Sequence, residues 1–325
     1  MSLQFIMGNS GSGKSYCLYD TVVREAIENP DKNYLVIVPE QFTMQTQKDL
    51  CLAHPKGGIM NIDVLSFGRL AYRVFEEVGQ DARVVLDDEG KNLVLRKIAG
   101  ECEKDLKVFK GNLKKQGYIS EVKSVLSEFA QYGVDFERLD DFMKEVPPES
   151  YLHYKLDDIR TIYEKFEEYL SEKYITKEEM LDVLSDAVPY SDILKGSVVA
   201  MDGFTGFTPV QNRLIGELFS VCEKVMITVT MDGRENPYVY EHPYQIFALG
   251  KQMVTSLMKI AGEKKTEIEE PICLFERPVY RFRDCSEMAF LETELFRYSG
   301  AKYNGSCESV SLHEVRSPGK EAKYV

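Results

Sequence analysis

Short apolar runs alternate with amphipathic stretches over the first 80 residues of the chain. The runs at residues 3–7, 34–38 and 61–65 are typical of strands buried on both faces of a parallel sheet. After them, apolar residues recur at helical spacing over residues 16–27, 45–52 and 66–75. Three successive strand-then-helix units predict a doubly wound α/β fold with a parallel sheet.

The pattern changes over residues 87–187, where almost no strand signal occurs and the apolar positions have helical spacing. Helices are predicted over residues 89–103, 120–132, 136–145, 151–173 and 177–187. Strand patterns return at residues 197–201 and 224–230, before a helix at 246–261. An α/β core interrupted by an all-helical insertion accounts for this order better than two sequential domains.

Beyond residue 262 the pattern weakens into what we expect to be a charged linker. Residues 309–315 predict one more strand, and residues 320–325 predict the opening of a helix. A helix that opens at the last residues of a chain favours a fragment of a longer protein.

The residues between the first strand and the first helix carry the clearest candidate chemistry. They fit the P-loop pattern G-x-x-x-x-G-K-[ST] at every required position, in the strand-loop-helix context that the motif requires. The glycines allow backbone N–H groups to surround an anion at the amino end of a helix. The candidate nucleotide-binding residues are Gly8, Asn9, Ser10, Gly11, Ser12, Gly13, Lys14 and Ser15. Lys14 is expected to reach the β and γ phosphates of ATP, and the Ser15 hydroxyl to bind Mg²⁺.

Asp202 is the candidate for the second half of this site. It follows the predicted strand at 197–201, and a carboxylate at a strand end can hold Mg²⁺ through water. An ordinary turn residue is the alternative interpretation. No second acid follows Asp202 in residues 203–211 to orient an attacking water.

Composition limits the partners and the compartment. The 325 residues carry a formal net charge of −13, which argues against strong autonomous binding to nucleic acid but allows a local basic groove. No run of about 18 apolar residues and no signal-peptide pattern are found, so we expect a cytoplasmic protein with no membrane partner. The seven cysteines and four histidines are scattered, so the sequence indicates reduced thiols and no metal cluster.

Four segments resemble, in order and spacing, the amino-terminal region of the AddB family. AddB proteins are subunits of the bacterial AddAB helicase-nucleases, and they contain a superfamily 1 helicase-like region. The similar segments are the P-loop and residues 38–43, 64–71 and 202–211, with further similarity at residues 236–247 and near Glu321. Only the P-loop is specific by itself, but the ordered set spans essentially the whole chain.

The resemblance implies a RecA-like P-loop NTPase fold and a division into domains. Residues 1–80 and 190–275 would form domain 1A, residues 81–189 the helical domain 1B, and residues 276–325 a linker and the start of a truncated domain 2A. It also implies single-stranded DNA contacts at Gln41, Thr43, Ser66 and Phe67, and a nucleotide-site role for Gln211.

The family also implies the partners and the biological role. The partners would be an AddA-type helicase-nuclease subunit, in a heterodimer, and DNA as single strands or duplex ends. The complex resects double-strand breaks for homologous recombination, and its AddB component scans the strand for a recombination hotspot. The nuclease domain of the family and the cysteines that bind its iron-sulfur cluster lie near the far end of the full-length protein. We therefore expect neither nuclease activity nor an iron-sulfur cluster in this chain.

Departures from active helicases predict a nucleotide-binding region that hydrolyses ATP poorly. Asp202-Gly203 stands where active helicases have Asp-Glu, followed by Thr205 and Gly206 in place of the usual polar Gln and Asp. Residues 231–235 read Met-Asp-Gly-Arg-Glu in place of Gly-Asp-x-x-Gln, and no adenine-reading glutamine segment precedes the P-loop. No catalytic residue is therefore assigned.

Two other interpretations stay open. One is a scaffold or DNA-scanning module whose vestigial P-loop no longer binds nucleotide. The other is an unrelated P-loop kinase or NTPase, although a kinase needs a general base and a lid arginine cluster, and the sequence indicates neither.

Overall fold

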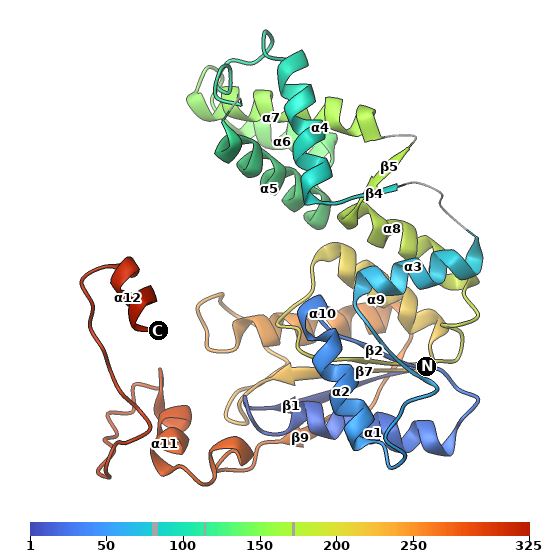
Figure 1. Ribbon diagram of the computed structural model, residues 1–325, viewed down its shortest axis with the longest axis vertical. Coiled ribbons are helices and arrows are strands. Elements are labelled where there is room, and N and C mark those ends of the chain that lie inside the picture. Colours follow the sequence, from blue (N-terminus) through green and yellow to red (C-terminus); the bar gives the residue numbers. More distant parts are fainter. Residues whose placement is uncertain (80–83, 114, 171–172) are drawn as a thin grey trace.

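A parallel sheet forms the centre of the computed structural model, which describes residues 1–79, 84–113, 115–170 and 173–325 (Figure 1). The seven described strands of this sheet run in the order β3-β2-β6-β7-β1-β8, and β9 also pairs with β1. All of these pairs are parallel, which confirms the predicted α/β class. The strands are β1 (Ser2–Gly8), β2 (Tyr34–Ile37), β3 (Ile62–Leu65), β6 (Val198–Met201), β7 (Lys224–Thr230), β8 (Glu267–Ile268) and β9 (Ile272–Leu274).

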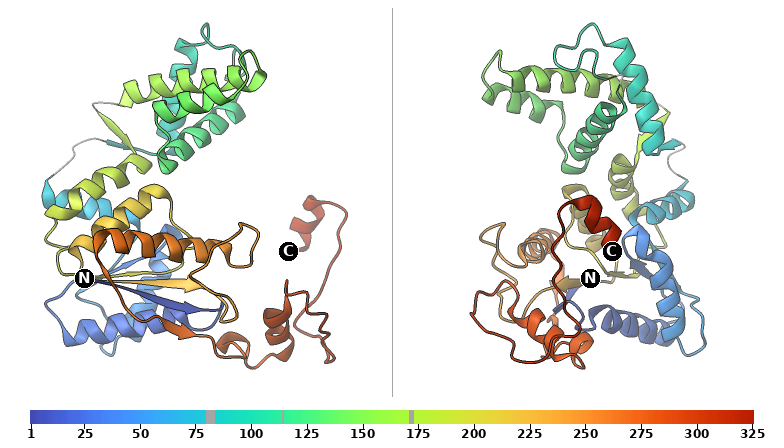
Figure 2. Two further views of the ribbon diagram at one scale, coloured as in Figure 1. Left: turned by 180° about the vertical axis from the view of Figure 1, so that it is seen from behind. Right: turned by 60° about the vertical axis from the view of Figure 1, so that its left-hand side comes forward.

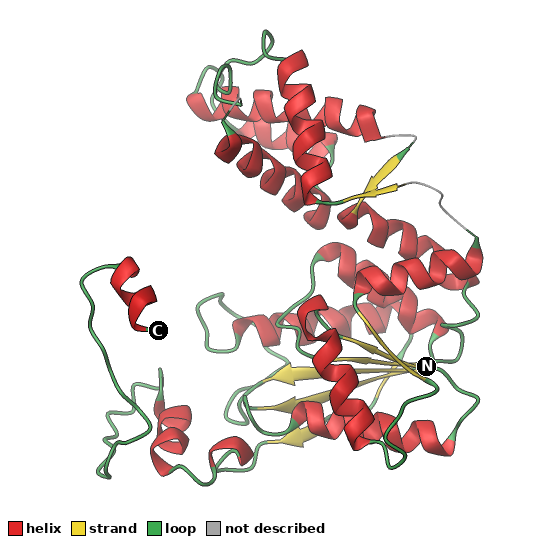
Figure 3. Cartoon of the chain, viewed as in Figure 1, coloured by secondary structure: helices red, strands yellow, loops and turns green. Residues whose placement is uncertain are grey.

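Helices cover both faces of the sheet (Figure 3). One face packs against α1 (Lys14–Glu28) and α2 (Thr43–Ala53). The other packs against α3 (Phe67–Val78), α8 (Lys177–Ala187), α9 (Pro209–Val221) and α10 (Ala248–Lys264). The alternation along β1 explains the two layers, since Leu3, Phe5 and Met7 join the second core and Ile6 joins the first. Short 3₁₀ turns lie at Glu40–Phe42 (η1), Val188–Tyr190 (η2) and Tyr280–Phe282 (η3).

The inserted helices gather at one end of the molecule around a core of their own (Figure 2). They are α4 (Asp88–Glu101), α5 (Gln116–Tyr132), α6 (Phe136–Glu145) and α7 (Tyr151–Leu170). Their core includes Val94, Leu95, Ile98, Phe109, Leu126, Ile159, Ile162 and Phe166. Within the described ranges, no helix is both long and apolar enough to cross a membrane.

The sequence led us to expect an all-helical insertion, but two strands lie at its base. Strands β4 (Val84–Leu86) and β5 (Tyr174–Thr176) pair in parallel there. Each strand has three residues, too short a run to be recognised from hydrophobic alternation, and the partner of each lies in a distant part of the sequence. The predicted boundary near residue 80 and the predicted helical residues 171–172 lie outside the described residues.

The predicted linker after residue 262 also contains structure that the sequence pattern did not indicate. Strands β8 and β9 extend the sheet beside β1, and α11 (Ser286–Glu294) follows η3. The strand predicted at residues 309–315 is wrong, because this segment is irregular and its Leu312 is almost fully exposed instead of packing against a sheet. The predicted opening of a helix at residues 320–325 is confirmed as α12 (Pro318–Tyr324).

Candidate functional site

The P-loop lies between β1 and α1, at the edge of the sheet where the strands end. Gly11 and Gly13 have φ angles of 84° and 94°, in the left-handed region that favours glycine. A Cβ on Gly8 would clash with the Ser12 hydroxyl and would lie 2.7 Å from the carbonyl oxygen of Leu274. The glycines of the motif are therefore required by the backbone path itself.

The loop has the features of an anion site. The Ser12 hydroxyl oxygen is buried and finds no hydrogen-bond partner among the described residues. Lys14 is half-buried, and its Nζ donates to the carbonyl oxygen of Asn9 at 2.9 Å. The first turn of α1, which is described in full, carries no acidic residue that would oppose a bound anion. An unpaired hydroxyl, a lysine and a helix amino end at one loop fit a phosphate group.

Burial makes the ammonium group of Lys14 easier to deprotonate. Loss of solvent lowers the pKa of its ammonium group from 10.5 to about 8. The carboxylate of Asp202 opposes this effect, while the guanidinium of Arg281 adds to it. A bound phosphate would favour the charged form of Lys14 and so restore its pKa.

Asp202 directly follows β6, which is separated from β1 by β7 alone. The side chain is buried, and each carboxylate oxygen accepts one hydroxyl: Thr228 donates to Oδ1 at 2.6 Å and Tyr19 to Oδ2 at 2.8 Å. Burial and the Asp202 carboxylate raise the pKa of the Tyr19 phenol, so this donor stays protonated. Asp202 is thus held in place by neutral groups.

The residues present fit a magnesium ion bound mainly by phosphate and water. Ser15 is exposed in the first turn of α1, as a hydroxyl ligand would need to be. Asp202 keeps free lone pairs that can accept from metal-bound water. Within the described part of the chain, no group of three or more His, Cys, Asp or Glu side chains could hold a metal by itself.

Gly203 follows Asp202, at the position where the resemblance to helicases predicts a second acid. Its φ angle is 78°, and a Cβ there would lie 3.5 Å from Cδ of Pro39 and 3.7 Å from the Phe42 ring. A residue with a side chain would be strained in this conformation. The backbone conformation at Gly203 therefore accounts for the absence of a carboxylate at this position.

Gln211 has a capping role in the structure. Its side-chain oxygen accepts from the backbone N–H of Thr208 at 2.9 Å, and its own N–H donates to the Thr208 hydroxyl at 3.3 Å. This capping box starts α9, with Pro209 in the first turn. The predicted nucleotide role of Gln211 stays a prediction.

The four candidate DNA contacts lie just after the neighbouring strands β2 and β3. Gln41 is exposed in η1, whereas Thr43 and Ser66 are buried. Ser66 caps α3 by accepting the N–H of Arg69 at 3.4 Å. Phe67 is buried against Phe204 and Phe207, with ring centroids 5.4 Å and 6.4 Å away. Of the four, only Gln41 presents its side chain openly.

An arginine cluster beside the P-loop was missed by the sequence reasoning. Asp232, just after β7, accepts from Arg234, Arg277 and Arg297 at 2.7, 2.7 and 2.9 Å. Burial of Asp232 acts against ionisation, but the bonds from Arg234 and the charge of Arg277 outweigh it and hold the pKa well below its usual range. Arg277 and Arg297 come from the predicted linker, and no local pattern connects them to Asp232.

Arg281 is a further cation at the loop. Its backbone N–H donates to the carbonyl oxygen of Gly11 at 3.1 Å. Its side chain lies so close that a Cβ on Gly11 would come within 2.7 Å of the Arg281 Cβ. The P-loop is therefore flanked by two cations, Lys14 from α1 and Arg281 from η3.

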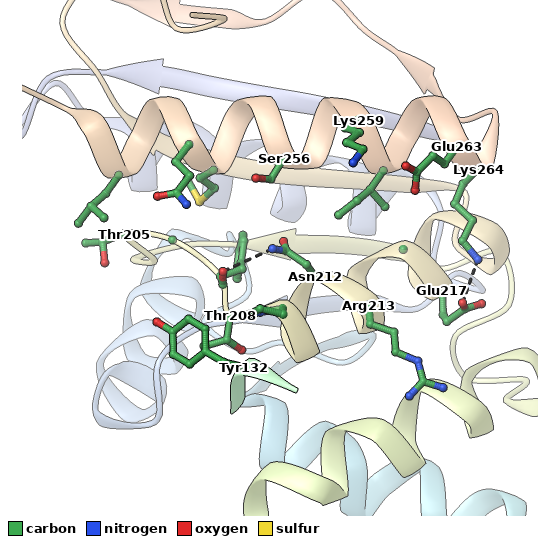
Figure 4. A pocket seen from close by; sticks show the side chains of 18 residues that line it. Tyr132, Thr205, Thr208, Asn212, Arg213, Glu217, Ser256, Lys259, Glu263 and Lys264 are labelled. Atoms are coloured by element: carbon green, nitrogen blue, oxygen red, sulfur yellow. Dashed lines mark hydrogen bonds and ion pairs between the residues drawn. The ribbon is translucent and has the colours of Figure 1, made fainter. Parts of the chain in front are cut away.

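A groove of about 790 Å³ lies elsewhere, between α9 and α10 (Figure 4). Residues 205–208 form one wall, and Tyr132 of α5 reaches it from the insertion. Two of its charged residues, Arg213 and Lys264, pair with carboxylates at 2.7 Å and 2.9 Å. Because its described lining includes no P-loop residue, the groove is not the nucleotide site.

Comparison with known proteins agrees with the resemblance seen in the motifs. The family profile described as "ADDB, N-terminal" matches residues 5–292. The whole chain is 42% identical to an ATP-dependent helicase/deoxyribonuclease subunit of Lachnoclostridium phytofermentans and 32% identical to the protein of the same name from Clostridium tetani. Over 97% of its length it is 36% identical to the namesake protein of Thermoanaerobacter sp. strain X514.

The chain spans 28%, 28% and 27% of the lengths of these three relatives, respectively. The profile match nevertheless covers the P-loop, Asp202, Asp232 with Arg234 and Arg277, and the inserted helices. The chain therefore belongs to the AddB family, within the region that its amino-terminal profile describes.

Proposed function

We propose that this chain is the ATP-binding, helicase-like region of an AddB-type protein that acts with an AddA-type partner on DNA ends. The observation that carries the proposal is the P-loop, in which the unpartnered Ser12 hydroxyl and the ammonium group of Lys14 converge with the amino end of α1. In this role the complex resects double-strand breaks during homologous recombination.

Residues 1–80 and 190–275 form a RecA-like domain 1A in this proposal, and residues 81–189 form domain 1B. Two features support this division: the strands of the sheet come from both outer ranges, and helices α4 to α7 have a separate core. Helix α8, at the end of the inserted range, packs instead against the sheet. Residues 276–325 lead into domain 2A.

Within this site the chain's own groups bind and orient the nucleotide. Lys14 and the loop N–H groups hold the phosphates, while Ser15 and Asp202 would hold Mg²⁺. The ion would neutralise phosphate charge when it is bound. Asp202 cannot turn freely, because the hydroxyls of Tyr19 and Thr228 fix both of its oxygens.

Hydrolysis is proposed to be slow. Gly203 leaves no carboxylate to orient water, which removes roughly 10²-fold or more in rate. Glu235, where a γ-phosphate-sensing glutamine is expected, is bound by Lys251 and Arg297, each at 2.7 Å. A carboxylate held by two cations is not available to sense the nucleotide.

Single-stranded DNA is proposed to cross the ends of β2 and β3, where Gln41, Thr43, Ser66 and Phe67 gather. The exposed Gln41 would contact the strand directly. The buried Ser66 and Phe67 would shape the surface from below, since one caps α3 and the other packs on Phe204.

The test is a titration of ATP-Mg²⁺ into the chain and into Lys14→Ala, with binding followed by calorimetry and hydrolysis followed in the same samples. We expect binding that is lost in the variant and negligible turnover in both. Turnover of several per second that Lys14→Ala abolishes would contradict slow hydrolysis. No binding to either protein would favour a scaffold with a vestigial P-loop.

A further inference from the structure

The segment after the sheet, residues 277–297, lies against the P-loop at two points. One is the bond that the backbone N–H of Arg281 donates to Gly11. The second contact is made by Asn9, whose side-chain nitrogen donates to Oε1 of Glu292 at 2.7 Å. The Asn9 contact joins residues that are 283 positions apart in the sequence.

Asn9 is almost fully buried and sits at the start of the loop. Its Nδ2 lies 2.7 Å from Glu292 and 3.4 Å from Oδ2 of Asp232, so the Glu292 bond is the stronger of the two. The backbone carbonyl of the same residue accepts both Lys14 Nζ and the N–H of Ser12, at 2.9 Å and 3.1 Å. Fixing the Asn9 side chain therefore fixes the carbonyl group that orients Lys14.

Glu292 is itself held rigidly. Its other oxygen accepts Arg277 Nη1 at 2.7 Å, and the same guanidinium binds Asp232 through Nη2 at 2.7 Å. Arg297 binds Asp232 and Glu235 from the end of the segment. These arginines anchor α11 to the carboxyl end of β7, so Glu292 is a fixed acceptor for Asn9.

We propose that Glu292 is a positioning residue for the nucleotide site, which acts through Asn9 to hold the P-loop in its phosphate-binding shape. This role rests on the proposed nucleotide binding. Because coupling between two events is reciprocal, nucleotide binding also holds α11 against the sheet. The phosphate site is thus completed by a helix that comes after the last strand of the sheet.

The first experiment measures ATP-Mg²⁺ affinity of the 325-residue chain and its variants by calorimetry. Glu292→Ala removes a charged acceptor and is expected to raise the dissociation constant about tenfold. Glu292→Gln keeps an oxygen for Asn9 and is expected to recover most of the affinity. The control is Glu276→Ala, which removes an exposed acid of the neighbouring segment and is expected to change nothing.

Asn9→Ala tests whether Glu292 acts through Asn9. We expect the Asn9→Ala/Glu292→Ala double variant to bind no more weakly than Asn9→Ala, because the two side chains share one interaction. Independent, additive losses would overturn the proposal. The proposal would also be overturned if Glu292→Gln bound ATP-Mg²⁺ as weakly as Glu292→Ala. The negative charge of Glu292 would then matter, and not the oxygen that accepts from Asn9.

A second readout needs no nucleotide. Amide hydrogen exchange of residues 8–13 is expected to be faster in Glu292→Ala than in the unmodified chain, and unchanged in Glu276→Ala. If the unmodified chain binds no ATP-Mg²⁺, the proposed function fails, and this exchange still tests the positioning of the loop. Unchanged exchange in Glu292→Ala would overturn the positioning role whether or not nucleotide binds.

Discussion

At the scale of single residues, the geometry of the site depends on backbone conformation and side-chain burial as well as on the residues of the P-loop motif. Gly203 illustrates this, since its left-handed conformation against Pro39 and Phe42 disfavours any side chain where active helicases have an acid. A single substitution that restores the acid would therefore strain the loop. The absence of the carboxylate is therefore linked to the backbone conformation of the loop after β6.

Lys14 gives a prediction about pH. Its pKa is about 8 without nucleotide, and bound phosphate favours the charged form. Binding above pH 8 therefore requires uptake of a proton, so the dissociation constant for ATP-Mg²⁺ should rise about tenfold from pH 7 to pH 9. Calorimetry at both pH values checks this.

The control is Lys14→Arg, because a guanidinium stays charged over this range. Its affinity is expected to be lower than that of the unmodified chain but independent of pH. A flat profile for the unmodified chain would mean that Lys14 is fully charged before nucleotide binds.

At this scale, the sequence predicted the features that depend on neighbouring residues in the chain. Residues 8–15 run from the end of a strand through a loop into the first turn of a helix, as expected, and Asp202 follows a buried strand. The contact of Asn9 with Glu292 could not be predicted, because 283 positions separate the two residues and no pattern joins them. The sequence Thr208-Pro209-Val210-Gln211 matches a capping box, which accounts for the bonds that Gln211 makes at the start of α9.

At the scale of elements, buried acids fix loops that hydrophobic contacts alone would leave loose. Asp158 on α7 is buried and accepts three backbone N–H groups, from Lys107, Val108 and Phe109, at 2.8, 2.7 and 2.8 Å. These bonds hold the loop after α4, whose Phe109 enters the core of the insertion. The loop is thus part of the core of the insertion.

Asp158→Ala should lower the free energy of unfolding of the insertion by about 3 kcal/mol, since two partly buried N–H donors and the buried N–H of Phe109 lose their acceptor. Urea unfolding followed by far-ultraviolet circular dichroism measures this change. The matched control is Asp157→Ala, which removes an exposed ion pair with Lys107 at 3.0 Å and is expected to change the free energy of unfolding far less. Equal losses in both variants would contradict the structural role of Asp158.

Long elements were predicted well and short ones were not. The expected helices at residues 136–145 and 177–187 are confirmed as α6 and α8, and the strand at 224–230 as β7. Strands β4, β5, β8 and β9 have two or three residues each, so their formation depends on partners far along the chain. Hydrophobic alternation over two or three residues is too short to be distinguished from chance.

At the scale of the whole molecule, the net charge of −13 opposes binding to a polyanion. We therefore expect a labelled 20-nucleotide single strand to bind more weakly than about 1 μM at 150 mM salt, as measured by fluorescence anisotropy. A sub-micromolar complex with this strand, or with any duplex, at this salt concentration would contradict the expectation.

At 50 mM salt, where weaker screening favours binding, Gln41→Ala should weaken the binding of the single strand about threefold through loss of an exposed polar contact. Gln45→Ala is the control, because Gln45 is also exposed but is occupied with Asp49 at 2.7 Å. If both variants bind alike, the strand does not cross η1.

The pairing of β1 determines the order in which the protein can fold during synthesis. Ser2 of β1 lies opposite Lys224 of β7, so the strand that leads into the P-loop stays unpaired until β7 has left the ribosome. At about 5 to 20 residues per second, this delay is roughly 10 to 45 s. The inserted helices can fold during that time, because their core lies within residues 94–170. The nucleotide site is therefore among the last parts of the chain to form, although its motif is among the first to be translated.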